Sequence, residues 1–201
     1  MPVDLREVLA PAHTAVLVIE CQEGVLGHSS PVGELARSVR EGPMLRTLRD
    51  FLAAARVAGA RVCHCTVESR ADGLGQLTNT PLGARTLGKS AAGAGAILPE
   101  LGPDPGDILA PRDHGLTAFH ETGLDGVLRS TGVRTVVLTG VSINIAITGA
   151  AIDAVDRGYT VVIPTDCVAG FPPSYASDAL RFSLRNLAYL STAEQICAIW
   201  K

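Results

Sequence analysis

Polar residues that could carry acid–base chemistry follow two apolar segments of this chain. Glu20 ends the run TAVLVIE (14–20), and Arg112 and His114 come directly after GDILA (106–110). A carboxyl group at the end of a buried strand loses part of its hydration, which raises its pKa and suits it to proton transfer. Arginine can pair with that carboxylate or hold an anionic substrate group, and histidine can exchange a proton near neutral pH. The pattern predicts an acid–base site or, alternatively, a purely structural ion pair.

A turn after a third apolar run adds backbone donors. GVSINIA (140–146) follows RTVVLTG (134–140) and opens a helical stretch, so its N–H groups could bind an anion or an oxyanion. Ser142 sits in a Gly-Val-Ser sequence, but Asn144 replaces the second glycine of the G-x-S-x-G nucleophile turn. We therefore expect Ser142 and Asn144 to hydrogen-bond the turn. The sequence has no P-loop, dinucleotide or zinc-protease motif, and we expect no cofactor.

The cysteines favour a reducing compartment. Five are present, an odd and scattered set, which argues against a disulfide framework and for the cytoplasm. Cys63 and Cys65 flank His64, but alternate residues of a strand face opposite sides, so these three do not converge on one metal. We expect buried thiols that act as small hydrophobes, and no metal.

Bulk composition indicates one globular domain spanning residues 1–201. Hydrophobic residues make up 47% of the chain and charged residues 18%, and the length is sufficient for a real core. The net charge of −3 comes without a basic block, which excludes nucleic acid and anionic membranes as expected partners. No apolar run approaches the roughly 20 residues of a membrane span, and the N-terminus does not resemble a signal peptide. A small-molecule substrate is the expected partner.

The order of apolar and helical segments predicts the architecture. Nearly continuous apolar runs typical of buried parallel strands occupy 14–20, 60–67, 106–110, 134–140, 159–165 and 187–192. Helical spacing occupies 44–59, preceded by Pro43, and also 124–132, 146–158 and 174–188, the last with Ser174 as its expected cap. This alternation predicts an α/β, Rossmann-like fold with three layers, α/β/α, around a six-stranded, mostly parallel sheet. Ligands of such folds bind beyond the carboxyl ends of the strands, where Glu20, Arg112 and the turn 140–146 are expected.

The sequence does not assign a single role to three further segments. The polar loop 67–82, with Arg70, Gln76 and Asn79, could form a pocket wall. The Gly- and Ala-rich segment 88–107 is expected to edge a pocket or a subunit interface. The apolar tail ending near Trp200 packs either within the domain or across a dimer.

Three stretches of the chain carry a family resemblance. They begin at Thr14 (TAVLVIECQEGVLG), Asp107 (DILAPRDHGLTAFHETGLDGVLRS, continuing to DRGY at 159) and Val161 (VVIPTDCVAG). In this order they are similar to the isochorismatase-like cysteine hydrolases. The resemblance implies a six-stranded parallel sheet with helices on both sides, assembly as a homodimer or homotetramer, and hydrolysis of a small molecule by an Asp–Lys–Cys triad. It also implies a cis peptide at Val141–Ser142.

The resemblance places altered residues at all three triad positions. Glu20 takes the place of the aspartate, Arg112 that of the lysine and Ala146 that of the cysteine, with Asp113 as an alternative alignment for the lysine. Without a thiol no covalent adduct can form at position 146. The neighbouring residues that we assign as candidates for substrate binding are Gln22, His114, Phe119, Val141, Ser142, Asn144 and Ile145.

Three functions fit this pattern. The first is an enzyme, a hydrolase or a lyase, that uses non-covalent acid–base chemistry with Glu20 as the acid, as in isochorismatases that cleave a vinyl ether. The second is a catalytically inactive relic that binds a small molecule or has a structural role. The third is a cysteine hydrolase with an engineered Ala146. The charges kept at Glu20 and Arg112 favour the first, because a useless site has no reason to retain a buried charge pair.

Overall fold

A parallel sheet forms the centre of the chain. The computed structural model describes residues 4–68, 70, 72, 74, 79–86 and 93–201. Six strands follow the order β3-β2-β1-β4-β5-β7, and a short β6 pairs with β4. Every strand pairing within the described residues is parallel. The strands are β1 (Thr14–Ile19), β2 (Arg61–Cys65), β3 (Ile108–Leu109), β4 (Thr135–Val141), β5 (Thr160–Pro164), β6 (Val168–Ala169) and β7 (Tyr189–Ser191).

The six predicted strands are confirmed, and β6 is the one that sequence reasoning missed. It contains two residues, too few to give an apolar run that differs from a loop. It adds a seventh strand without changing the order of the other six.

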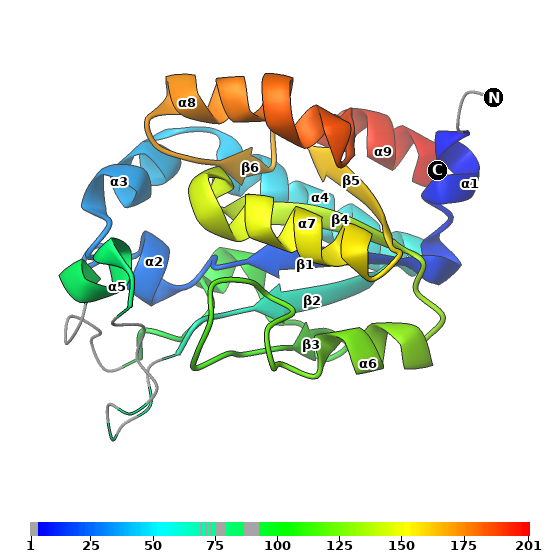
Figure 1. The fold of residues 1–201 in the computed structure, drawn as a ribbon. Coiled ribbons are helices and arrows are strands. Elements are labelled where there is room, and N and C mark those ends of the chain that lie inside the picture. Colours follow the sequence, from blue (N-terminus) through cyan, green and yellow to red (C-terminus); the bar gives the residue numbers. More distant parts are fainter. Residues whose placement is uncertain (1–3, 69, 71, 73, 75–78, 87–92) are drawn as a thin grey trace.

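Helices cover both faces of the sheet, which confirms the three-layer α/β/α architecture. Figure 1 shows α4 and α9 behind the sheet and α6, α7 and α8 in front of it, and the two apolar clusters of the core lie on these two faces. The main helices are α3 (Gly33–Glu41), α4 (Met44–Ala58), α6 (Leu124–Ser130), α7 (Thr148–Asp156), α8 (Pro173–Asp178) and α9 (Ala193–Trp200). Shorter ones are α1 (Leu5–Val8), η1 (Pro11–His13), α2 (Glu23–Leu26), α5 (Pro81–Thr86), η2 (Pro99–Leu101), η3 (Ile143–Ile147), η4 (Ala179–Ser183) and η5 (Leu184–Asn186).

The predicted helices exist, but two begin at other residues, and the one expected at 174–188 is divided into α8, the π-helical η4 and the 3-10 helix η5. Helix α4 begins after Pro43 and ends at Gly59 in the left-handed conformation, as expected for a glycine cap. The helix expected from 146 begins earlier, with the π-helical turn η3. The expected cap Ser174 is wrong: α8 already begins at Pro173, because a proline at the first helical position has a suitable φ and needs no hydrogen-bond donor.

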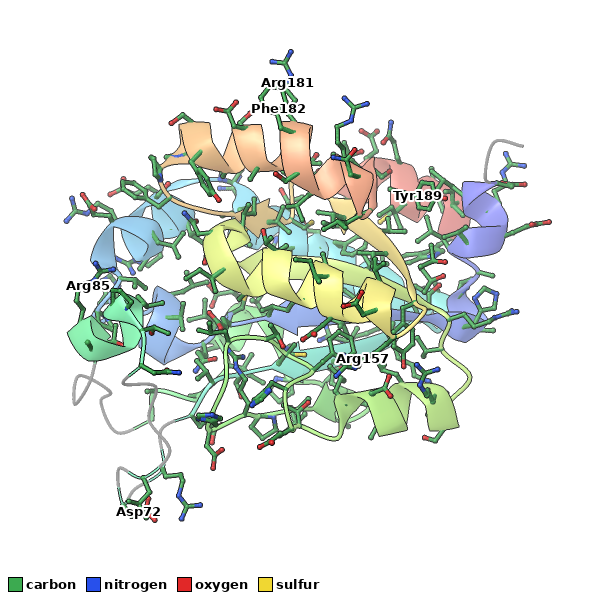
Figure 2. All side chains as sticks on the ribbon, in the orientation of Figure 1. Asp72, Arg85, Arg157, Arg181, Phe182 and Tyr189 are labelled. Atoms are coloured by element: carbon green, nitrogen blue, oxygen red, sulfur yellow. The ribbon has the colours of Figure 1, made fainter. Side chains whose placement is uncertain are left out.

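The apolar tail packs within this chain. Thr192 caps α9 in a reciprocal capping box with Gln195. The Trp200 ring stacks on Phe51 of α4, with centroids 5.3 Å apart, and its Nε1 donates to the Leu9 carbonyl at 2.8 Å. Not every aromatic is so used: Phe182 of η4 is 61% exposed and points away from the molecule (Figure 2).

The register of the sheet brings three loops to one edge. Ile19 at the end of β1 pairs with Cys65 of β2 and with Gly140 of β4. A Cβ atom at Gly140 would lie 2.2 Å from the Ile19 carbonyl oxygen, and φ there is +95°, so only glycine fits this close approach. The segments after β1, β2 and β4 therefore leave the sheet side by side. Among the described helices none is long and apolar enough to cross a membrane.

Candidate functional site

Glu20 and Arg112 form a buried ion pair at this edge of the sheet. Oε1 of Glu20 accepts a hydrogen bond from Nη2 of Arg112, and the two side chains are 16% and 4% exposed. Burial raises the pKa of Glu20 above the ordinary value of 4.5, and the Arg112 guanidinium opposes that rise because it favours the carboxylate. The pairing that the sequence suggested is therefore present.

The loop after β3 fixes the position of Arg112. The Arg112 amide donates to the Thr66 carbonyl at 3.0 Å, and the Glu68 amide donates to the Arg112 carbonyl at 2.8 Å. These bonds continue the parallel pairing beyond the end of β2. In contrast to Arg112, Asp113 has a half-exposed side chain that lies 3.8 Å from Arg70, so Arg112 is the residue that faces Glu20.

One nitrogen of the Arg112 guanidinium makes no hydrogen bond with the described residues. Nε and Nη2 approach the carbonyl oxygens of Gly115 and Leu116 at 3.4 and 3.5 Å. Nη1 is buried and has no hydrogen-bond partner among the described residues. A buried donor without an acceptor is costly, so the ion pair with Glu20 leaves part of the hydrogen-bonding capacity of Arg112 unused.

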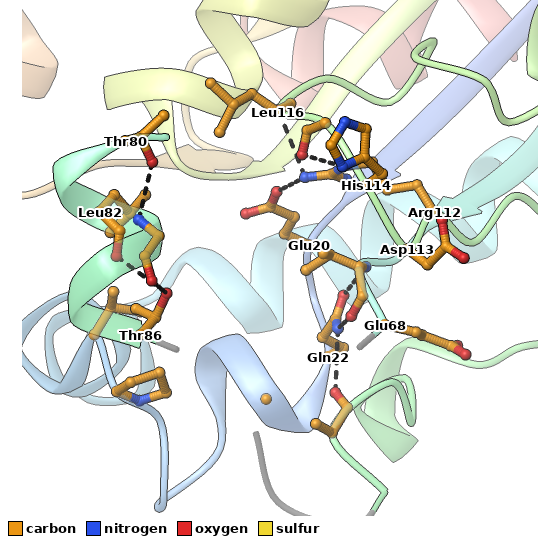
Figure 3. A pocket seen from close by; sticks show the side chains of 17 residues that line it. Glu20, Gln22, Glu68, Thr80, Leu82, Thr86, Arg112, Asp113, His114 and Leu116 are labelled. Atoms are coloured by element: carbon orange, nitrogen blue, oxygen red, sulfur yellow. Dashed lines mark hydrogen bonds and ion pairs between the residues drawn. The ribbon is translucent and has the colours of Figure 1, made fainter. Parts of the chain in front are cut away.

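A cavity of about 200 Å³ opens beside the pair. Figure 3 shows the Glu20 carboxyl group between α5 on one side and the loop with Arg112 and Leu116 on the other. The other described residues around the cavity are Gln22, Gly24, Pro31, Val32, Val67, Glu68, Thr80, Leu82, Gly83, Thr86, Ala94, Asp113, His114 and Gly115.

Gln22 reaches the cavity, but its amide is already engaged. Its Nε2 donates to the carbonyls of Val67 and Ala94, the latter at 3.1 Å, and its Oε1 accepts from the Val67 amide at 2.8 Å. Gln22 thus ties the segments at 67 and 94 to the end of β1. The expectation that segment 88–107 edges a pocket is met at Ala94, whereas residues 88–92, and Gln76 of the other loop, lie outside the described residues.

His114 lines two cavities. It lines the cavity beside Glu20 and also a second one of about 370 Å³, together with Glu68, His120 and Glu121. The rings of His114 and His120 are tilted, with centroids 5.4 Å apart. Gly115 has φ +78°, and a Cβ atom there would lie 2.3 Å from the His120 ring, so glycine permits this packing.

The turn after β4 has the cis peptide at Val141–Ser142 that the resemblance implied. Its residues, however, are not among the described residues around the Glu20 cavity. Val141 and Ala146 are buried in the two apolar clusters, and Ile145 is more than one-third exposed. The Ser142 carbonyl accepts from the amides of Ile145 and Ile147, so it is the Ser142 backbone that closes the turn.

Asn144 joins the turn to the segment before α8. Its Nδ2 donates to the Phe171 carbonyl at 2.7 Å, and its Oδ1 accepts from the Phe171 amide at 2.9 Å. We expected Asn144 to hydrogen-bond its own turn and to bind substrate, but its side-chain amide is used between two chain segments. Sequence spacing could not show this, because Phe171 is distant along the chain.

Phe119 belongs to the core. It is 4% exposed, its ring stacks on Tyr159 with centroids 6.0 Å apart, and the Arg157 guanidinium lies 5.2 Å from its ring centroid. The structure does not bring this predicted substrate-binding residue to the described lining of the cavity. An aromatic side chain on a loop is as useful for covering a core as for binding a ligand.

The chain matches a known protein family over most of its length. The Isochorismatase domain model matches residues 14–195. The chain belongs to the isochorismatase family. Its relatives include the ureidoacrylate amidohydrolase RutB of Enterobacter sp. (strain 638), 25% identical over 206 residues, which cover 94% of this chain and 89% of that protein. A RutB of Methylorubrum extorquens is 31% identical over 159 residues, 70% of this chain and 63% of that protein.

Solved structures agree with the family assignment. An isochorismatase family protein from Burkholderia thailandensis superimposes with a TM-score of 0.78 and 25% identity, covering 94% of this chain and 96% of that one. A cysteine hydrolase from Pseudomonas syringae pv. phaseolicola also gives 0.78, at 21% identity, covering 100% of this chain and 95% of that one. The second likeness concerns the fold alone.

The loop 67–82, predicted as a possible pocket wall, supplies Val67, Glu68, Thr80 and Leu82 to the cavity, but sequence reasoning missed the rest of that wall in this isochorismatase-family chain. Helix α5 and the segment at Pro31 and Val32 lie opposite Glu20. A signal for α5 was present: Thr80 precedes Pro81, and its Oγ1 accepts from the Gly83 amide at 2.9 Å. A threonine cap followed by proline is a typical helix start. Nothing in the sequence indicated that this helix would face Glu20.

Proposed function

We propose that this isochorismatase-family chain hydrolyses a small, amide-containing or anionic metabolite, with Glu20 as general acid and base and without a cysteine nucleophile. The observation that carries the proposal is the buried Glu20–Arg112 pair at the wall of a cavity. Two relatives named as amidohydrolases support an amide as the reacting group. Burial raises the pKa of Glu20, which makes its carboxylate a stronger base for taking a proton from water.

No thiol is suited to replace the family's cysteine. Its position corresponds to Ala146, whose methyl group cannot attack a carbonyl carbon. Cys21 belongs to the apolar cluster with α4, on the opposite face from Ala146. Burial raises the pKa of Cys65 to about 12, so Cys65 is a neutral thiol at physiological pH and a poor nucleophile. Acid–base chemistry at Glu20 remains.

The geometry allows Glu20 to act with both of its oxygens. Oε1 is held by Arg112, and the other oxygen faces the open space toward α5 (Figure 3). In the proposed reaction, a water molecule adds its hydroxyl to the substrate carbonyl carbon and its proton passes to Glu20. The carbon–nitrogen bond then breaks, and the leaving nitrogen takes a proton from Glu20. The carboxylate form is stabilised by Arg112 at every stage in which Glu20 lacks its proton.

Glu20→Gln tests this assignment, because glutamine keeps the shape of the side chain but cannot transfer a proton. Against a panel of small amides and ureas, we expect its kcat/KM to fall by about 10²–10⁴-fold. Glu34→Gln is the matched control, since Glu34 is exposed on α3. An unchanged rate in Glu20→Gln would remove Glu20 from the reaction.

Ala146→Cys separates this proposal from a cysteine hydrolase with an engineered alanine. We expect Ala146→Cys to hydrolyse the panel no faster than the wild-type protein, and a thiol-alkylating reagent to leave its rate unchanged. The wild-type protein, treated with the same reagent, is the control. Strong, alkylation-sensitive hydrolysis would mean that the site lacks only its cysteine. If neither protein hydrolyses any compound of the panel, the result supports the hypothesis of a catalytically inactive relic.

Assembly and location stay predictions. We infer a homodimer or homotetramer and a cytoplasmic protein that forms one domain, as the sequence suggested. Light scattering of the purified protein tests the assembly directly.

A further inference from the structure

The cavity beside Glu20 carries its available polar groups at one end. Arg112 Nη1 is buried without a hydrogen-bond partner among the described residues. One oxygen of Glu20 faces the cavity (Figure 3). Glu68 and Asp113 also lie on this side, away from α5 (Figure 3), and both line the second cavity too. The Arg112 end is therefore the charged and polar end of the cavity.

The opposite wall presents hydrocarbon. The hydroxyl oxygen of Thr80 accepts from the Gly83 amide at 2.9 Å, and the Thr86 hydroxyl donates to the carbonyls of Leu82 and Gly83 at 3.1 and 3.3 Å. The Thr80 oxygen and the Thr86 hydroxyl proton are thus engaged by the backbone of α5 or of its first turn. Leu82 completes this wall (Figure 3), and Pro31 and Val32 extend it.

The side-chain amide of Gln22 does not change this polarity. Its nitrogen and oxygen are both engaged by the backbone of Val67 and Ala94. Within the described lining, the wall that faces Arg112 therefore offers a ligand apolar contacts from Leu82, Val32 and Pro31, and it carries no charged side chain.

We infer that the substrate is a compact amide with a single polar head: its amide group lies at the end of the cavity with Glu20 and Arg112, and a short apolar body lies against Leu82 and Val32. This inference rests on the proposed function for the amide and adds the shape and polarity of the rest of the molecule. The volume of about 200 Å³ is below the roughly 300–1,000 Å³ typical of pockets for drug-sized ligands. Leu82 is then a specificity-determining residue, because a charged group at the far end of the substrate would lose its water against an apolar wall.

Butyrate and succinate test this preference in the full-length protein. Butyrate is the acid product expected from butyramide, and succinate adds a second carboxylate at the other end of the same four-carbon chain. Neither can be hydrolysed, so calorimetric titration measures binding without turnover. We expect butyrate to bind at least about tenfold more tightly than succinate, since one uncompensated buried charge has at least this effect. Equal affinities, tighter binding of succinate, or no binding of either acid would overturn the inference.

Variants on the two walls make the test specific. Leu82→Asn should bring the two affinities within about threefold of each other, and Val32→Asn should act in the same direction if Leu82→Asn does not fold. Val57→Asn is the matched control, because Val57 is 91% exposed on α4, and it should leave the ratio unchanged. Arg112→Lys should weaken both acids, since lysine lacks the planar fork of arginine. A ratio that Leu82→Asn and Val32→Asn both leave intact would remove the specificity role from this wall.

Failure of this inference can be told from failure of the proposed function. If butyrate is preferred through Leu82 but no amide is hydrolysed, the ligand class stands and catalysis by Glu20 does not. If amides are hydrolysed and those with a second acid group react fastest, the hydrolase stands and the single-headed substrate does not.

Discussion

At the scale of single residues, the Glu20 carboxyl group is held between two opposing effects. Burial raises its pKa, and the Arg112 guanidinium acts in the opposite direction. Burial has the larger effect, so the pKa is raised and the carboxylate is a stronger base toward a water molecule than a solvated one would be. Arg112 limits the shift and stabilises the carboxylate that remains after the proton has left.

Removing the charge of Arg112 should move the pH dependence of the reaction. In Arg112→Gln, Glu20 loses the interaction that lowers its pKa, so it stays protonated to a higher pH. Because the carboxylate form takes the proton from water, activity rises as pH rises through this pKa, and the ascending limb of kcat/KM should shift to higher pH. Arg112→Lys keeps the charge and should shift it less. A limb that stays in place or moves to lower pH would contradict the pairing; NMR titration of the Glu20 carboxyl carbon gives the same information if activity is too low.

At the scale of elements, a buried polar cluster joins β2, β3 and α4. Asp107, directly before β3, accepts from Arg56 Nη2 at 2.6 Å, from His64 Nε2 at 3.0 Å and from the Asp104 amide at 2.9 Å. His64 and Asp107 are almost fully buried. Strand β3 contains only two residues, so few backbone hydrogen bonds hold it in the sheet. The Asp107 cluster therefore holds the start of β3 against the sheet and α4.

The protonation state of His64 should make this cluster sensitive to acid. Burial lowers the pKa of His64 below the ordinary 6.5, although Asp107 opposes the change. A histidine that the fold keeps neutral contributes stability that is fully present above its unfolded pKa and is lost as pH falls through its folded pKa. His64→Gln keeps a donor for Asp107 but cannot be protonated. We therefore expect the free energy of unfolding to fall less in the variant than in the wild type between about pH 7 and about pH 5.

Urea denaturation at the two pH values measures this difference. The range stays above 3.8, the ordinary pKa of aspartic acid, and the folded pKa of Asp107 is lowered further by Arg56, the Asp104 amide and His64 against the effect of burial. Titration of Asp107 therefore does not enter the comparison. His28→Gln, at an exposed site, should behave as the wild type. An equal loss of stability in His64→Gln and wild type would show that His64 does not control it.

At the scale of the whole molecule, the last helix closes the fold onto the first. Trp200 stacks on Phe51 of α4 and donates to the Leu9 carbonyl. One side chain thus links the segment before β1, the longest helix and the C-terminal helix. These elements are far apart in sequence, so their contact belongs to the completed structure.

Trp200→Ala should destabilise the protein by about 2–4 kcal/mol, at or below the usual range for a tryptophan in a core because Trp200 is only partly buried. Trp200→Phe keeps a ring over Phe51 and loses only the donor to Leu9, which should cost about 1 kcal/mol. Phe182→Ala is the aromatic control, because its ring is exposed, and it should change stability by no more than about 0.5 kcal/mol. Chemical denaturation checks all three, and a loss in Phe182→Ala equal to that in Trp200→Ala would refute the role of the contact.

The sequence by itself determined the fold class, the six main strands and the candidate residues Glu20 and Arg112 of the site. All side chains of a continuous apolar run such as 134–140 are buried only if the sheet is covered on both faces. The order of these runs therefore already implied three layers. Glu20 was identifiable because a carboxyl group directly after such a run must lie at the end of a buried strand. The resemblance added the cis peptide at Val141–Ser142, which the structure has.

Only the tertiary structure decided what surrounds that pair. That Arg112 and not Asp113 faces Glu20 depends on how the loop after β3 pairs with the end of β2. That Asn144 binds Phe171, that Phe119 lies in the core, and that Leu82 faces the cavity depend on contacts between distant segments. Burial and periodicity are local properties that a sequence records residue by residue. The partner of a side chain is set by the packing of separate elements, and no spacing along the chain encodes it.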